Sequence, residues 1–288
     1  MHGDSRPPPT LLEPTGVGPL LRRWREARRL TQLDLALEAA ISTRHLSFLE
    51  SGRATPSRAM LVKLSNVLDV PLRERNLLLL AAGHAPLYRE TPLDDPRMAQ
   101  VRTALELILT QNEPRSALAF DRHWNIVMAN AAYVRFLTFA LGRAPAGLSP
   151  LQLSIPSRWN LLHLIFDPTA IRRVIVNWEP IAKSLLEQAQ RVAAWTRDET
   201  METLIAALLA YPGVPAHWRE PELEAPDGLV LPFELDLGDG RIAKMFGTET
   251  TLSTPRDVTL QELRIEAFYP ADAATAAMSF DGLGALAV

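Results

Sequence analysis

Residues 31–57, TQLDLALEAAISTRHLSFLESGRATPS, restrict the fold of this chain more than any other stretch. Thr31 is a good helix N-cap, and Asp34 stands where a capping-box acid reaches back to it. Ser42 can cap a second helix, which Gly52 ends. Two short helices therefore follow each other with room only for a tight turn between them. The pattern predicts a helix-turn-helix.

The second of these helices has two distinct faces. Leu46 and Leu49 are three residues apart, so they lie on one face and anchor the helix in a core. The opposite face carries polar, basic and aromatic side chains: Thr43, Arg44, Ser47 and Phe48. A helix of this kind fits the major groove of B-DNA, where the fork of Arg44 matches guanine O6 and N7. We therefore expect the region to read double-stranded DNA.

Other residues are expected to complete the DNA contacts. Phe48 can pack on a thymine methyl group, and Ser47 can reach a base or a phosphate. Gln32 starts the first helix of the motif, where its amide and free backbone N–H groups can hold a phosphate. Backbone contacts on the other flank are expected from the exit loop and the residues after it: Arg53, Thr55 and Arg58.

The first 80 or so residues read as five helices by apolar spacing and end signals. They are Gly18 to Arg29, one capped by Thr31, Ser42 to Glu50, one opened by Pro56-Ser57, and Leu72 to Ala82. Glu50 is expected to fix the fold through an arginine such as Arg22 or Arg28 rather than to touch DNA.

Charge is divided unevenly along the chain. Residues 16–82 hold 11 Lys or Arg against 6 Asp or Glu, a net of +5, whereas residues 83–288 hold 18 against 25, a net of −7. A basic head is drawn to phosphates and an acidic body is repelled by them. A merely solvated helical surface would give the same count, so charge alone leaves both interpretations open.

Composition excludes several classes of protein. Without cysteine there are no disulfides, Cys-type zinc fingers or thiol nucleophiles. No apolar run reaches 18 residues, so we expect no membrane span. The Pro-rich residues 1–15 lack the order of a signal peptide and predict a flexible arm on a cytoplasmic protein.

Three blocks carry a family resemblance: LRRWREARRLTQLDLA, ISTRHLSFLESGRATPS and LVKLSNVLDVP. From Leu20 to Val70 the chain resembles the repressor-type helix-turn-helix of the XRE family, the phage repressor and Cro class. The resemblance implies DNA binding. Ala40 departs from it, because the family usually has Gly in the turn. Either Ala40 adopts the left-handed conformation at some cost, or the turn differs.

Beyond a linker at residues 83–92, the pattern mixes helices and strands. Helices are expected from Met98 to Thr110, Asn130 to Leu141, and over much of Leu161 to Leu209. The expected strands are Ser116 to Phe120, Trp124 to Ala129, Leu229 to Leu237, Ile242 to Leu252 and Glu262 to Phe268, with Gly238-Asp239-Gly240 as a hairpin turn. This order predicts an α+β, PAS-like domain with a roughly five-stranded antiparallel sheet.

The body also carries a family resemblance, in Asp121 to Asn125 with Asn130, NLLHLIFDP, Asn177 to Glu179, YPGVPAHW, and TPRDVTLQELRIEAFYPAD. These blocks resemble the ligand-binding domain of MmyB-like regulators. The resemblance implies a small apolar ligand, such as a fatty-acyl chain, in a pocket between sheet and helices.

The residues permit such a pocket. Its candidate lining is Phe136, Leu137, Leu162, His163, Phe166, Trp178, Met245, Phe246, Ile265 and Phe268. Each of them could instead fill the core, as aromatic residues and Met usually do. A carboxylate on the ligand would need cations such as Arg172, Arg173 or His163. The six histidines are isolated from one another in the sequence, so we expect no metal site and no haem, and the sequence establishes no cofactor.

Together these patterns predict a flexible arm at 1–15, an all-α helix-turn-helix domain at 16–82, a linker at 83–92, and a PAS-like ligand-binding domain at 93–288. The predicted function is a homodimeric, sequence-specific transcriptional regulator that senses a small apolar ligand. The alternative is a constitutive DNA-binding regulator whose body only dimerises or recruits a partner. No phosphate loop or nucleophile motif points to an enzyme.

Overall fold

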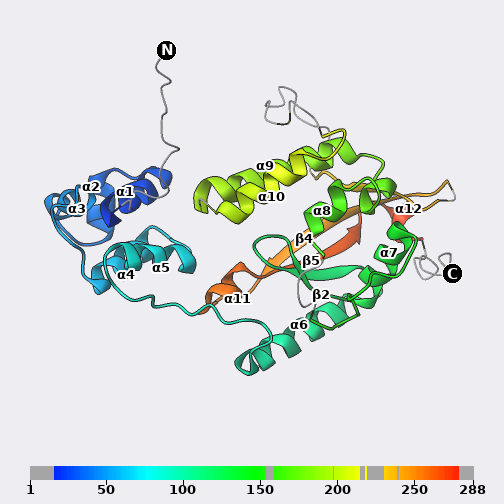
Figure 1. Ribbon diagram of the computed structural model, residues 1–288, viewed down its shortest axis with the longest axis horizontal. Coiled ribbons are helices and arrows are strands. Elements are labelled where there is room, and N and C mark those ends of the chain that lie inside the picture. Colours follow the sequence, from blue (N-terminus) through cyan, green and yellow to red (C-terminus); the bar gives the residue numbers. More distant parts are fainter. Residues whose placement is uncertain are drawn as a thin grey trace, which may run out of the picture. The chain divides into compact units, whose positions relative to one another are not determined.

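In a computed structural model of the chain, the structure describes residues 16–153, 159–196, 198–214, 218, 230–238 and 240–278. The chain divides into two compact units (Figure 1). The first runs to Glu90 and also takes in Thr254–Gln261, and the second comprises Thr91–Ser253 and the residues from Glu262 on. The arm expected at residues 1–15 lies outside the described residues.

Five helices make up the described N-terminal part of the first unit, as the sequence predicts. They are α1 (Val17–Ala27), α2 (Gln32–Glu38), α3 (Thr43–Glu50), α4 (Arg58–Val67) and α5 (Leu72–Ala81). Their core contains the fully buried Leu21, Leu35, Leu46 and Leu49. The leucines expected to anchor the second helix of the motif therefore do so.

Two further segments are fastened to this unit. After α5, the Asn76 side chain accepts from Tyr88 N at 3.0 Å and donates to Tyr88 O at 2.7 Å. The segment Thr254–Gln261 comes from much later in the chain: Gln261 Oε1 accepts from Leu72 N at 2.6 Å, at the start of α5. Its helix, α11 (Val258–Glu262), precedes a strand of the second unit directly. The two units are thus joined by the chain at more than one point.

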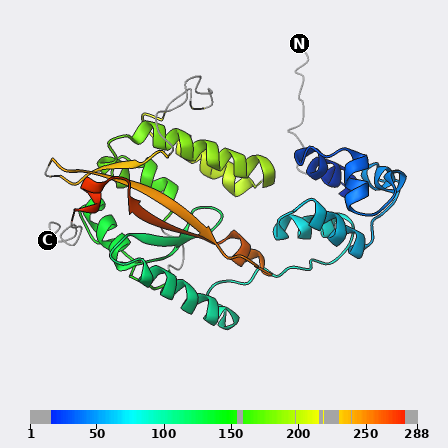
Figure 2. The ribbon, with the colours of Figure 1, turned by 180° about the vertical axis from the view of Figure 1, so that it is seen from behind.

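The second unit is built on one antiparallel sheet, which has five strands within the described residues. They are β1 (Ala117–Phe120), β2 (Ile126–Ala129), β3 (Phe233–Asp236), β4 (Ile242–Thr251) and β5 (Arg264–Pro270), in the order β2-β1-β5-β4-β3. Strands β3 and β4 form the hairpin expected around residue 239, and β4 and β5 share the longest pairing. Figure 2 shows this sheet from behind. The predicted α+β class is confirmed.

Helices cover both faces of the sheet. After the 3-10 turn η1 (Pro96–Met98), helix α6 (Ala99–Gln111) packs Leu105 and Leu109 on one face, against Ala119 and Ile265. The other face carries the larger core, to which Leu118 and Phe120 contribute. Its elements are α7 (Ala131–Leu141), α8 (Leu161–Phe166), η2 (Ile171–Val174), α9 (Trp178–Thr196) and α10 (Glu199–Leu209), and α12 (Ala273–Ala276) contacts β4 and β5.

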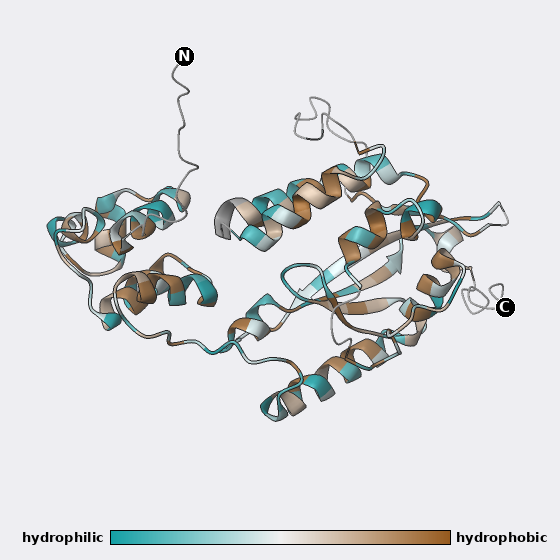
Figure 3. Cartoon of the chain, viewed as in Figure 1, coloured by the Kyte–Doolittle hydropathy of each residue, from teal (hydrophilic) through white to brown (hydrophobic). Residues whose placement is uncertain are grey.

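Side-chain polarity follows this layering. Figure 3 shows brown apolar and teal polar residues alternating along α6 and α9, as expected for helices with one buried face. In the described part of the chain no helix is both long and apolar enough to cross a bilayer.

Candidate functional site

The turn of the helix-turn-helix is fixed by its caps. Thr31 Oγ1 accepts from Asp34 N at 3.1 Å, and Asp34 Oδ2 accepts from Thr31 N at 2.9 Å, so the expected capping box is present. Ser42 Oγ accepts from His45 N at 3.1 Å and caps α3. Between them Ala40 has φ +45°, which settles the two alternatives for the turn: alanine occupies the left-handed conformation.

A buried ion pair fastens α1 to α3. Arg25 Nε and Nη2 donate to the two carboxylate oxygens of Glu50 at 2.7 and 3.0 Å, and both side chains are at least nine-tenths buried. Gln32 Nε2 at the start of α2 donates to the same carboxylate at 2.8 Å. One acid therefore ties together three helices, so α3 is held rigidly.

This pairing corrects the expectation for Glu50, which named Arg22 or Arg28. Arg22 pairs with Glu26 one turn along α1, at 2.7 Å. Arg28 donates to the carbonyl oxygens of Leu68 and Asp69 at the end of α4. Glu50 is buried, and the arginine of α1 that faces the same interior is Arg25, which is itself buried. Helical phase, which a sequence gives only approximately, decides the partner.

The residues expected to contact DNA remain accessible. Arg44 lies over the Phe48 ring with its guanidinium carbon 5.3 Å from the ring centroid, and Arg53 does so at 5.9 Å. Two cations thus flank one aromatic ring. Among the eight residues expected to contact DNA, four are exposed: Arg44, Arg53, Thr55 and Arg58. The other four are half-buried: Gln32, Thr43, Ser47 and Phe48. The amide of Gln32 is held by Glu50, so this residue can add its backbone N–H more readily than its side chain to a phosphate.

The second unit contains a cavity of about 470 Å³ between the sheet and the helices. Its volume lies in the usual range for small-molecule sites. The walls are largely apolar and come from β1, α7, α8, α9, β3, β4, β5 and α12. Of the ten residues expected to line a pocket, the cavity is lined by three: Phe136, Met245 and Phe268.

The other seven lie elsewhere. Four belong to the packed core: Leu137, Leu162, Phe166 and Trp178, whose indole N–H donates to Ile165 O at 2.8 Å. Phe246 and Ile265 occupy the strand positions next to Met245 and Glu266, and successive strand residues face opposite sides. Phe246 stacks on Tyr269, with ring centroids 5.9 Å apart.

The expected cationic anchors also lie away from the cavity lining. His163 Nδ1 meets the Tyr211 hydroxyl at 3.1 Å, and burial lowers the pKa of its imidazole. The guanidinium of Arg172 covers the Trp178 ring at 3.4 Å and donates to Pro212 O. Arg173 lies near Gly142. The expectation of a carboxylate anchor formed by these groups is corrected, because none of them is among the residues that line the cavity.

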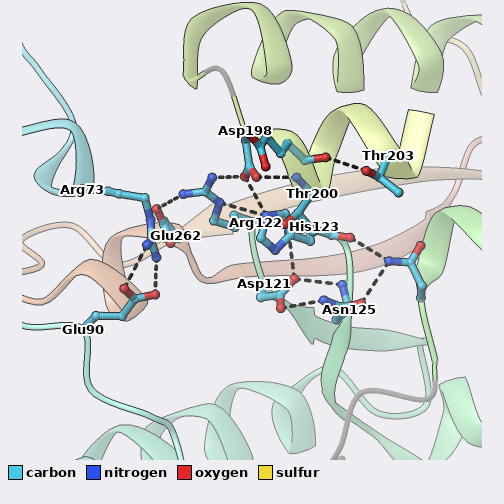
Figure 4. Close-up of polar contacts among 12 residues, drawn as sticks. Arg73, Glu90, Asp121, Arg122, His123, Asn125, Asp198, Thr200, Thr203 and Glu262 are labelled. Carbon is cyan, nitrogen blue, oxygen red and sulfur yellow. Dashed lines mark hydrogen bonds and ion pairs between the residues drawn. The ribbon is translucent and has the colours of Figure 1, made fainter. Parts of the chain in front are cut away.

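A polar turn between β1 and β2 positions one wall of the cavity (Figure 4). Asp121 Oδ1 accepts from the backbone N–H of His123 and of Asn125 at 2.8 and 2.9 Å. The turn holds Trp124 at φ +61°, with its ring stacked on Phe120, and both aromatic residues line the cavity. The motif that runs from residue 121 to 125 therefore shapes the pocket.

The same turn carries a half-buried charge cluster, also drawn in Figure 4. Arg122 donates to Glu262 Oε1 at 3.0 Å and to the carboxylate of Asp198, which also meets His123 Nε2 at 2.7 Å. Asp198 caps α10, and Glu262 ends α11. The cavity wall is thereby tied to the helix that begins in the first unit.

Two polar residues of the cavity were not anticipated. Tyr133 of α7 is fully buried, and burial raises the pKa of its phenol, with a smaller contribution from the charge of Glu266. Burial, followed by the charge of Glu249, raises the pKa of the Glu266 carboxyl to about 7. The sequence held a signal for Glu266. It stands between the apolar Ile265 and Ala267, so its charged side chain faces the opposite side of the sheet from theirs.

Family models match both parts of the chain. The model for the MmyB-like transcription regulator ligand binding domain matches residues 101–279, and a helix-turn-helix model matches residues 21–75. The chain belongs to the MmyB-like transcription regulators. As in the resemblance noted from the sequence, this family joins a helix-turn-helix to a ligand-binding domain.

Two curated proteins are similar to part of this MmyB-like regulator. An uncharacterized HTH-type transcriptional regulator, RghRB of Bacillus subtilis, is 42% identical over 74 residues, which are 25% of this chain and 51% of that protein. Multiprotein-bridging factor 1 of Debaryomyces hansenii is 35% identical over 69 residues, 24% of this chain and 46% of that protein. The chain spans about half the length of the curated relatives it matches.

Proposed function

We propose that this regulator binds specific DNA sequences as a cytoplasmic homodimer and adjusts that binding when a small apolar ligand, such as a fatty-acyl molecule, fills its PAS-like body. It acts by binding and not by catalysis. The observation that carries the proposal is that one chain contains both a rigidly held helix α3 and, in its second unit, an apolar cavity.

DNA reading is assigned to the exposed face of α3. Arg44 supplies a guanidinium that matches guanine, and its position over Phe48 orients it before contact. Arg53 and Arg58 lie exposed beyond the helix and supply phosphate contacts. Orientation in advance lowers the conformational entropy lost on binding.

Dimerisation follows from the size of the reading surface. One helix of eight residues, α3, reads few base pairs, and a two-fold axis doubles the recognised sequence. Half-sites are then expected roughly 34–36 Å apart, one helical turn of DNA, or a multiple of that distance.

The polar turn at residues 121–125 supports ligand sensing. Trp124 contacts the cavity, and Arg122 of the same turn pairs with Glu262. The next residue back, Gln261, accepts from Leu72 N within the first unit. A ligand that shifts Trp124 can thus bias the chain segment that carries α11.

DNA selection from a random pool, followed by titration of the selected duplex, tests the DNA-binding half of the proposal. Arg44→Ala should weaken binding by about 5- to 150-fold and relax the preference at one base pair, as expected for loss of a bidentate base contact. Arg143→Ala, at an exposed arginine of the second unit, is the matched control and should bind as the wild type does. Unchanged affinity and preference in Arg44→Ala would remove this residue from the reading set.

Mass spectrometry of the purified protein after denaturation tests the ligand-binding half. We expect a co-purified amphiphilic molecule, and we expect its removal to change the affinity for the selected duplex. If the affinity is the same with and without it, the body serves only dimerisation or partner recruitment.

A further inference from the structure

The cavity of the second unit has a few polar groups in a largely apolar wall. Tyr133 is 1% exposed and lines the cavity, and its hydroxyl has no hydrogen-bond partner among the residues that the structure describes. A buried hydroxyl without a partner is costly, so such groups are usually satisfied. Here the hydroxyl can be satisfied by a molecule inside the cavity.

Glu266 lines the same cavity. It pairs in register with Leu118 of β1 and Glu249 of β4, so its side chain is on the sheet face that forms the cavity wall. Within the described chain no hydrogen bond or ion pair engages its carboxyl group. Its proximity to Tyr133 is reflected in the raised pKa of that phenol. With its own pKa raised to about 7, the carboxyl is substantially protonated near neutral pH and can both donate and accept.

The remaining charged groups of the lining are engaged elsewhere. The Arg115 guanidinium lies 5.2 Å from the centroid of the Tyr269 ring. Arg135 pairs with Glu113 at 3.4 Å, and Glu249 pairs with Arg264 at 3.4 Å. The charged and titratable residues that line the cavity are thus Arg115, Tyr133, Arg135, Glu249 and Glu266. Of these, the Tyr133 phenol and the Glu266 carboxyl remain available to bind a ligand.

We propose that Tyr133 and Glu266 together hold the polar end of the ligand, and that this end is an uncharged hydrogen-bonding group, a hydroxyl or a carbonyl, rather than a carboxylate. The inference rests on the proposed apolar-ligand function. A neutral oxygen accepts from the phenol and exchanges a hydrogen bond with Glu266. A carboxylate would instead meet two acidic side chains, Glu266 and Glu249, in a poorly solvated space where like charges repel strongly.

Calorimetric titration of the full-length protein with 1-decanol and with decanoate, which have the same chain length, tests this preference. At pH 8 the wild type should bind 1-decanol about tenfold more tightly than decanoate. Tyr133→Phe should weaken 1-decanol binding by about five- to tenfold and leave decanoate binding nearly unchanged. Glu266→Gln, which removes the charge but keeps the shape, should tighten decanoate binding and reduce the preference to within about threefold.

Tyr211→Phe is the matched control, since the Tyr211 hydroxyl is held by His163 and lies outside the cavity lining. It should leave both affinities unchanged. Tighter or equal binding of decanoate by the wild type would overturn the assignment of a neutral polar end while leaving the apolar-ligand function intact. Binding of neither molecule would overturn both. The wild-type comparison decides the matter even if a variant does not fold.

Discussion

One buried polar group in each unit shows how differently such groups are satisfied: Arg25 in the first unit and Tyr133 in the second. In the first unit the guanidinium of Arg25 is held by both oxygens of Glu50, which also accepts from Gln32. In the second unit Tyr133 is equally buried, and its hydroxyl has no partner among the described residues. A closed network holds one shape, whereas an open one can be completed by a ligand. The first unit is therefore suited to present a fixed surface and the second to respond.

The largest effect is expected from opening the closed network. Arg25→Ala leaves Glu50 buried without its cation, which should lower the free energy of unfolding of the first unit by about 3–5 kcal/mol. The control is Arg22→Ala, whose pair with Glu26 is exposed and should contribute less than about 1 kcal/mol. Urea denaturation measures both. Similar small losses of unfolding free energy in the two variants would show that the buried ion pair does not stabilise the first unit.

Next in size is the pH dependence of the second unit. Glu266 has a folded-state pKa of about 7, above the ordinary value of 4.5, so between these values the folded state holds the proton more tightly than the unfolded chain. The contribution of Glu266 to the free energy of unfolding is therefore fully present below about pH 4.5, and it is lost as the pH rises through 7. Relative to Glu266→Gln, the wild type should lose about 2 kcal/mol of stability between pH 5 and 8, as measured by thermal denaturation. Parallel curves for the two proteins would contradict a buried, protonated Glu266.

A smaller effect of opposite sign is expected when the open group is removed. Tyr133→Phe deletes a buried hydroxyl without a partner and should stabilise the ligand-free protein by about 1 kcal/mol. Tyr211→Phe deletes a hydroxyl that is bonded to His163 and should destabilise it by about 1 kcal/mol. Denaturation midpoints of the two ligand-free variants, compared with the ligand-free wild type, measure both effects. Destabilisation by both substitutions would mean that Tyr133 already has a partner.

The smallest effect concerns the turn of the head. Ala40 has φ +45°, which costs an alanine about 1–2 kcal/mol, whereas glycine adopts it freely but loses more chain entropy. Ala40→Gly should therefore raise the free energy of unfolding by less than about 1 kcal/mol and leave DNA affinity unchanged. A loss of stability would indicate that the turn is not strained.

Local patterns predicted the first unit well. Caps such as Thr31 and Ser42 act through neighbouring residues, and Leu46 and Leu49 follow helical spacing, so these features can be seen in a short stretch of sequence. The partner of Glu50 could not, because it depends on how α1 and α3 are rotated when packed. The positions of the five strands along the chain were predicted for the same local reasons, whereas their order in the sheet was not predicted.

The cavity was predicted less well. Whether an apolar residue such as Leu137 or Phe136 fills the core or lines the cavity depends on where packing is incomplete, and no periodicity records that. Phe246 and Ile265 were included in the expected lining, although each neighbours a residue that does line the cavity, Met245 or Glu266, and successive strand residues face opposite sides. Glu266 was missed as well, although a charged residue between Ile265 and Ala267 in an apolar strand signals a special environment.

Titration of the selected duplex with the full-length protein, in the presence and absence of saturating 1-decanol, tests most directly whether the two units act together. We predict that 1-decanol changes the affinity for DNA by about fivefold or more, the lower range of allosteric coupling. The change should be smaller in Arg122→Ala, which breaks the pair with Glu262. An affinity that stays the same at saturating 1-decanol would contradict ligand control of DNA binding.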